Sequence, residues 1–133
     1  MRLIPLFLMF SVFTNMALLA DDTPPITPAE AATKINQKVV VKMEVKSTGG
    51  KNNFYLNSEE DFKDAKNFTI FISKDHVEKF KKAGVENPSM YYKGKTIQVT
   101  GTVVLEKADG TEKKPWIKVE EPDQIKVITK ENP

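Results

Sequence analysis

The sequence predicts an all-β fold with accessory helices, in which five strands form a small barrel in the order α-β-β-β-α-β-β. The first observation behind this is the segment from Gly94 to Ile128, where two apolar runs flank the turn sequence Ala108-Asp109-Gly110. The apolar positions of the two runs are Ile97, Val99, Val103, Leu105, Trp116, Ile117 and Val119. This pattern predicts a long hairpin. The second observation is Gly101, which holds an inward position and lets the first strand of the hairpin bend as a small barrel requires.

Three earlier segments alternate with the same period of two and predict the other strands, at residues 39–45, 53–57 and 68–73. Their inward residues are Val39, Val41, Met43, Val45, Phe54, Leu56, Phe68, Ile70 and Ile72. Between these strands, residues 47–52 (STGGKN) are expected to form a glycine-bearing turn and residues 58–67 a charged loop. Each predicted strand therefore has one apolar face, as the wall of a barrel requires.

A capping signal predicts a helix in front of the first strand. Thr27, Pro28 and Glu30 supply a cap, a first-turn proline and a capping-box acid. We therefore expect a helix of about ten residues, over positions 27–36, that packs on an end or a face of the barrel.

A second helix is expected after the third strand. Ser73 can cap it and Gly84 can end it, and its apolar residues at helical spacing are Val77, Phe80 and Ala83. The stretch that follows, with Pro88 and Tyr91-Tyr92, is expected to be a connector leading to the hairpin.

Residues 1–20 have the layout of a secretory signal peptide, because an early arginine precedes an apolar run and small residues precede an acidic pair. A membrane anchor is the alternative, but polar residues interrupt the run, which is shorter than the roughly 20 residues that span a bilayer. We expect cleavage after Ala20, a flexible leader at 21–25 and one domain at 26–130, with no membrane span in the mature chain. The chain has no cysteine, so it is not a lipoprotein and is expected to be periplasmic or secreted.

The charge of the mature chain is nearly balanced. Removal of residues 1–20 takes away the single arginine and leaves 19 lysines against 18 acidic residues, a net charge of +1. Bulk charge therefore does not indicate a polyanionic partner. Without guanidinium groups that read guanine edges, sequence-specific recognition of nucleic acid is disfavoured.

The order of elements and the bent glycine-bearing strand resemble the OB-fold, a five-stranded Greek-key barrel. The resemblance covers residues 39–128. Its most specific parts are the G-K-x-I-x-V-x-G pattern from Gly94 to Gly101 and the P-D-Q-I sequence from Pro122 to Ile125. Together with the signal peptide, these features resemble small exported bacterial OB-fold proteins.

The OB-fold resemblance implies a ligand groove on the outer surface of the second and third strands, flanked by two loops. Tyr55 and Phe71 point outward there, with Trp116 expected nearby. The flanking loops supply Lys46, Lys51, Lys113 and Lys114. Aromatic rings among lysines can bind the bases of single-stranded nucleic acid or the rings of an oligosaccharide. The sequence therefore favours a non-catalytic binding module.

Two observations keep other interpretations open. The leading helix at 27–36 could lie over Tyr55 and Phe71 and turn them into a second, minor core. An acidic cluster beside the predicted groove would also repel phosphate; its members are Glu59, Glu60, Asp61 and Asp64. The alternative function is a structural domain that docks an envelope protein and has no small ligand. The identity of the ligand and the oligomeric state are left open by the sequence.

The sequence contains no recognisable catalytic or cofactor motif, so we predict that the protein is not an enzyme and takes no cofactor. Ser73, Asp75 and His76 share one short turn, where their side chains cannot converge into a triad. No metal site is expected, because His76 is the only histidine, cysteine is absent and the acidic run lacks EF-hand spacing.

Overall fold

The computed structural model describes residues 23–107 and 113–128. Within them the chain forms seven strands: β1 (Lys38–Glu44), β2 (Ser47–Gly49), β3 (Phe54–Asn57), β4 (Thr69–Ile72), β5 (Thr96–Lys107), β6 (Lys113–Val119) and β7 (Ile125–Val127). The helical elements are α2 (Pro28–Ala31), α3 (Val77–Lys82), α4 (Pro88–Tyr92) and two 3₁₀ turns, η1 (Lys74–His76) and η2 (Pro122–Gln124). The predicted signal peptide at 1–20 and the turn Ala108-Asp109-Gly110 lie outside the described residues.

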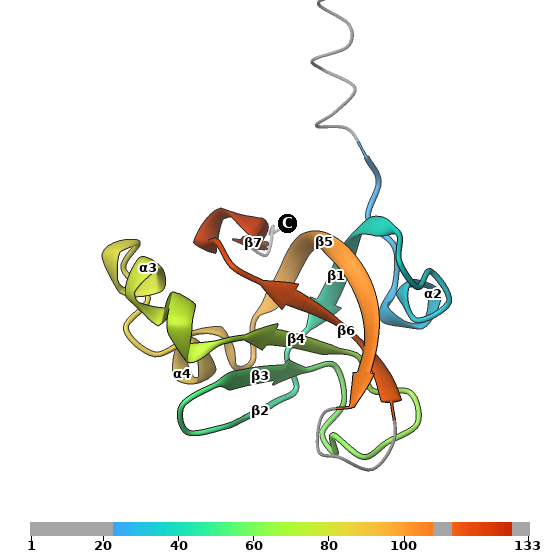
Figure 1. The fold of residues 1–133 in the computed structure, drawn as a ribbon, viewed down its shortest axis with the longest axis horizontal. Coiled ribbons are helices and arrows are strands. Elements are labelled where there is room, and N and C mark those ends of the chain that lie inside the picture. The colour runs from blue at the N-terminus through green and yellow to red at the C-terminus, as the bar shows by residue number, and fades with distance from the viewer. Residues whose placement is uncertain (1–22, 108–112, 129–133) are drawn as a thin grey trace, which may run out of the picture.

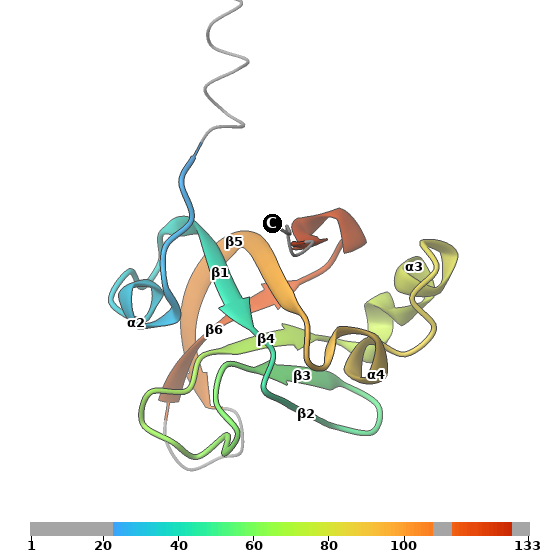
Figure 2. The same ribbon diagram turned by 180° about the vertical axis from the view of Figure 1, so that it is seen from behind.

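The strands form one curled sheet in the order β1-β5-β6-β4-β3-β2, with β7 added beside β5. All pairs are antiparallel except β4 with β6. The two ends of this order, β1 and β2, are consecutive in the chain, so the sheet curls into a barrel (Figures 1 and 2). At their junction the Val45 amide donates to the Lys95 carbonyl, and the Lys46 amide donates to the Asn57 carbonyl, each at 2.9 Å. One bent segment thus changes its pairing partner and serves both ends of the barrel.

The predicted number of five strands is wrong in two places, although the five expected barrel segments are present. One addition is β2, which lies inside the predicted turn at 47–52, because Ser47 to Gly49 pair with Asn57 to Tyr55. The other addition is β7, which follows η2 and pairs Ile125 with Val99 of β5.

The inward residues predicted from alternation are buried, which confirms the assignment of the barrel faces. The exception is Leu105, whose residue surface is 43% exposed. It lies on the part of β5 that pairs only with β6, beyond the segment paired with β1. The hairpin therefore extends past the end of the core, where alternation no longer implies burial.

Gly101 lies at the bend of β5, where the strand passes from β1 to β6. It is buried, and an ideal Cβ placed on it would lie 2.6 Å from Cγ2 of Ile117. The Gln124 side chain also approaches this position, and its Nε2 donates to the Thr100 carbonyl at 3.0 Å. The inward position of Gly101 predicted from the sequence is thus confirmed. The space that a side chain would occupy there is filled by Ile117 of the neighbouring strand β6.

The leading helix is shorter than predicted. The capping box of Thr27 and Glu30 is present, but α2 has one turn, and the expected helix over 27–36 is wrong beyond it. Asn36 has φ 69° and donates its amide to the Val103 carbonyl at 2.7 Å. This bond to β5 replaces continued helical bonding, while Ala31 packs into the core.

The helices on the other side of the barrel follow β4. Ser73 accepts a hydrogen bond from the Asp75 amide and caps η1, which leads into α3. Phe80 of α3 is fully buried, whereas Ala83, predicted on the same apolar face, is exposed just before the left-handed Gly84. The predicted connector contains a further helix, α4, whose first turn is capped by Asn87.

Tyr92 of α4 lies in the core, and this burial, together with the adjacent Tyr91, raises the pKa of its hydroxyl to about 12. The folded-state pKa lies above the ordinary value of about 10, so this stabilising contribution is complete below pH 10. It is lost as the pH rises from about 10 to about 12. We expect wild type to lose about 2 kcal/mol more unfolding free energy than Tyr92→Phe between pH 9 and 11.5. Urea unfolding at both pH values measures this, and equal losses would contradict it.

Candidate ligand-binding face

Three aromatic rings lie together on the outer surface of β3, β4 and β6. We call Tyr55, Phe71 and Trp116 the aromatic face. Tyr55 and Phe71 are direct cross-strand partners with ring centroids 5.3 Å apart. Trp116 stacks on Phe71 at 4.9 Å and lies 6.3 Å from Tyr55. The structure therefore brings together the three aromatic residues that were predicted from outward positions on separate strands.

The three rings differ in how far they reach solvent. Tyr55 and Phe71 are half-buried, whereas Trp116 is only 5% exposed although it does not belong to the hydrophobic cluster inside the barrel. Its indole Nε1 is enclosed and has no hydrogen-bond acceptor among the described residues. An enclosed donor without an acceptor costs about 1–3 kcal/mol, so the environment of this N–H is an unusual feature of the face.

The leading segment does not cover the aromatic face. Ile26 forms a bridge with Val41, and α2 packs against β1. Figures 1 and 2 both show α2 at the opposite end of the barrel from α3 and α4, beside β1 and β5. The interpretation in which this helix makes Tyr55 and Phe71 a second core is therefore wrong.

The face is also open toward β2. Gly49 is paired with Tyr55, and a Cβ placed on Gly49 would meet nothing within 4 Å. Its φ is not in the left-handed range, so a side chain is tolerated there. No sequence pattern indicates this position, because residues 47–52 are typical of a turn.

A buried polar network borders the face where β3 and β4 meet the charged loop. Asn67 Nδ2 donates to Thr69 Oγ1 at 3.0 Å, and Thr69 Oγ1 donates to Asn57 Oδ1 at 2.9 Å. Asn67 Oδ1 accepts from the Glu59 amide at 3.1 Å, and Ser47 Oγ donates to the Glu59 carbonyl at 2.7 Å. Sequence reasoning missed this network. Its only local signal was the placement of Asn57 and Thr69 at outward strand positions beside the loop.

The predicted lysines are spread around the barrel. Lys46 lies between β1 and β2, Lys51 follows β2, and Lys113 and Lys114 begin β6. Lys46, Lys51 and Lys113 are exposed, and Lys114 is half-buried. A different lysine, Lys118 of β6, forms an ion pair with Glu106 of β5 across the hairpin, with its Nζ 2.8 Å from Glu106 Oε1. This ion pair was not predicted, because it depends on the register of β5 and β6.

The acidic residues predicted to border the groove serve partly to fold their own loop. Asp61 accepts a hydrogen bond from the Lys63 amide, and Asp64 accepts one from the Lys66 amide, each at 2.9 Å. Among the described residues, no group of three His, Cys, Asp or Glu side chains is placed to hold a metal ion. The helices in the same part of the chain are all too short or too polar to cross a membrane.

Comparison with known proteins finds similarity in structure only. No protein-family model and no curated protein matches the chain. Among solved structures, aspartyl-tRNA synthetase from Entamoeba histolytica matches with a TM-score of 0.55 and 18% identity over 84% of this chain. A putative aspartyl-tRNA synthetase from Leishmania major matches at 0.52 and 13% over 84%. Asparaginyl-tRNA synthetase from Pyrococcus horikoshii matches at 0.51 and 17% over 78%.

The matched region spans 22%, 22% and 23% of those three chains, so the similarity concerns one part of each enzyme. Identities this low carry information about the fold alone. Together with the strand order and the parallel pairing of β4 with β6, these matches show that the chain has an OB-fold.

Proposed function

We propose that this protein is a non-catalytic binding module that holds single-stranded nucleic acid, or an oligosaccharide, on its aromatic face. The observation that carries the proposal is the pair of half-buried rings of Tyr55 and Phe71 on the outer surface of the barrel, with Trp116 stacked on Phe71. Half-buried rings outside the core offer a flat apolar surface on which a base or a sugar ring can stack.

Single-stranded nucleic acid is the ligand that we favour. The similar solved structures are named as tRNA synthetases, which supports a nucleic-acid ligand for a shared OB-fold. The absence of arginine from residues 21–133 favours contacts to phosphate by lysine and stacking, without reading of base edges. The binding we propose is therefore tolerant of sequence.

We further propose that the protein acts outside the cytoplasm, as the small exported bacterial OB-fold proteins that it resembles do. The support for this is the signal-peptide layout of residues 1–20. Expression of the whole chain followed by N-terminal sequencing of the exported product tests it. An intact N-terminus on a cytoplasmic product would contradict export.

Titration of residues 21–133 with oligothymidylate and with a neutral oligosaccharide tests the binding proposal. Amide shifts should gather on β3 and β4, and Tyr55→Ala should weaken oligonucleotide binding about tenfold, because one stacked base contributes about 1–3 kcal/mol. Tyr91→Ala is the matched control, since Tyr91 is a 40% exposed tyrosine on α4. No shift on β3 and β4 with either ligand at millimolar concentration would contradict the proposal and assign the face to a protein partner.

A substitution at Gly49 separates the two ligand classes. Gly49→Glu places a carboxylate beside Tyr55 in space that is open, so the fold should be retained. The added charge repels phosphate and leaves a neutral sugar largely unaffected. Loss of oligothymidylate binding alone would identify the ligand as a polyanion, whereas equal weakening of both ligands would indicate steric blocking.

A further inference from the structure

We propose that the Lys118–Glu106 ion pair is a strap over Trp116 that a phosphodiester ligand opens. In the open state Lys118 binds a phosphate and the indole N–H of Trp116 donates a hydrogen bond to the ligand. This inference rests on the proposed function of the aromatic face and specifies single-stranded nucleic acid as the ligand.

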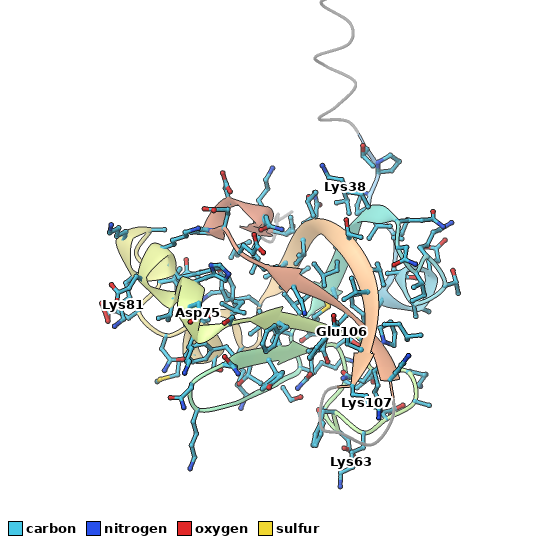
Figure 3. The ribbon with its side chains drawn as sticks, viewed as in Figure 1. Lys38, Lys63, Asp75, Lys81, Glu106 and Lys107 are labelled. Atoms are coloured by element: carbon cyan, nitrogen blue, oxygen red, sulfur yellow. The ribbon has the colours of Figure 1, made fainter. Side chains whose placement is uncertain are left out.

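The strand register places the ion pair across Trp116. Trp116 is paired with Val104, and Glu106 is paired with Lys114, on the same outward side. Lys118 follows Trp116 by two residues and Glu106 follows Val104 by two, so in this antiparallel pair they lie on opposite sides of the Trp116–Val104 row. An ion pair of 2.8 Å between them therefore crosses that row. Figure 3 labels Glu106 on the hairpin of β5 and β6.

The burial of the aromatic face agrees with this placement. Trp116 is 5% exposed, although it lies on the same outer surface as the half-buried Tyr55 and Phe71. Phe71 stacks against one part of its ring system, and the ion pair crosses its strand row. Opening of the strap would uncover the enclosed Nε1, which has no acceptor in the described part of the chain.

The strap itself is weak enough to open. The side chains of Lys118 and Glu106 are 47% and 41% exposed, and exposed ion pairs contribute little to stability because water and salt screen them. A phosphate oxygen can replace the Glu106 carboxylate as the partner of Lys118 at little cost. The ligand would then satisfy a donor that the free protein leaves without an acceptor.

The surface next to the Lys118–Glu106 ion pair has room for a single strand of nucleic acid. An open depression of about 490 Å³ lies at the bend of β5, and Val104 and Lys118 form one part of its lining. Lys38 of β1 and Glu120 also line it. A nucleic-acid backbone that leaves the aromatic face at Lys118 would therefore enter a depression that a second lysine and one carboxylate also line.

Substitutions in the strap test the exchange of partners. Glu106→Gln should bind oligothymidylate several-fold more tightly, because Lys118 no longer has a competing carboxylate. Lys118→Gln should bind more weakly and should reduce the slope of log K against log salt by about 0.7, the value for one phosphate contact on a single strand. Lys79→Gln is the matched control, since Lys79 forms a 2.7 Å ion pair with Glu121 at similar exposure and neither residue belongs to the aromatic face or the strap. An unchanged slope in Lys118→Gln would overturn the proposal.

The chain has a single tryptophan, so the indole N–H gives one unambiguous signal in a nitrogen–proton NMR spectrum. Saturating oligothymidylate should move this signal downfield, and Trp116→Phe should bind roughly threefold to tenfold more weakly, the effect of one lost hydrogen bond. Glu106→Gln should speed exchange of the indole proton with solvent. If amides of β3 and β4 shift while the indole signal stays in place, the binding function stands and the strap is wrong.

Discussion

Replacement of Gly101 by alanine is expected to lower the free energy of unfolding by about 1–3 kcal/mol, the usual cost of an added group in a well-packed core. The new Cβ would lie 2.6 Å from Cγ2 of Ile117, and Ile117 is fully buried and cannot turn away. The backbone of Gly101 is not in the left-handed range, so the cost is steric. Urea unfolding of the two proteins measures the difference.

Two further variants make this prediction specific. Gly49→Ala adds the same methyl group in open space and should change stability by less than about 0.5 kcal/mol. Ile117→Leu removes Cγ2 while keeping the side-chain volume, so the double variant Gly101→Ala/Ile117→Leu should recover part of the loss. Strict additivity of the two substitutions would show that the contact with Ile117 is not the cause.

Replacement of Asn67 by alanine is expected to cost about 2–3 kcal/mol of unfolding free energy, because it removes a buried side chain and leaves several part-buried partners without their hydrogen bonds. The Glu59 amide loses its acceptor and Thr69 Oγ1 loses a donor. The Phe62 carbonyl, which accepts from Asn67 Nδ2 at 3.4 Å, also loses its contact. The charged loop between β3 and β4 should therefore loosen beside the aromatic face.

Hydrogen exchange and a matched asparagine test this prediction. The Glu59 amide should exchange faster in Asn67→Ala, while amides of β1 and β5 should keep their relative protection. Asn52 is exposed on the turn after β2, and Asn52→Ala should change stability by less than about 0.5 kcal/mol. Similar losses from both substitutions would contradict a specific role of the buried network.

The barrel strands could be predicted because each has one buried face, which imposes a period of two on the sequence. This rule placed Val41, Leu56, Ile70 and Ile117 inward without knowledge of their partners. It failed where burial depends on position along the barrel, as at Leu105, which lies past the end of the core.

The elements that were mispredicted are fixed by tertiary contacts. Residues 27–36 have caps and helical spacing, but the hydrogen bond from Asn36 to Val103 ends the helical path early. The residues Ser47 to Gly49 look like a turn because of their glycine, yet pairing with β3 makes them a strand. No local sequence pattern indicates that Asn36 bonds to β5 or that Ser47 to Gly49 pair with β3. The start of α4 is different, because Asn87-Pro88 is itself a local helix-start signal, with asparagine as the cap and proline in the first turn.

The candidate site also has a part that could be predicted from alternation and a part that depends on contacts between strands. Alternation alone placed Tyr55 and Phe71 on one outward surface. The stacking of Trp116 and the Lys118–Glu106 pair depend on the parallel pairing of β4 with β6 and on the hairpin register. Both are relations between strands, so a single sequence does not reveal them.

The change of partner at Val45 and Lys46 also leads us to expect an order in which the strands fold. During synthesis, which starts at the N-terminus, β2, β3 and β4 can pair as soon as these neighbouring segments are made. In contrast, β1 pairs with residues 96–102, which are made much later. Pairings this distant in sequence make loop closure costly, and small β-barrels of this kind fold in milliseconds to seconds. Until β5 has formed, β1 lacks its partner strand, and the apolar side of β1 remains exposed to solvent.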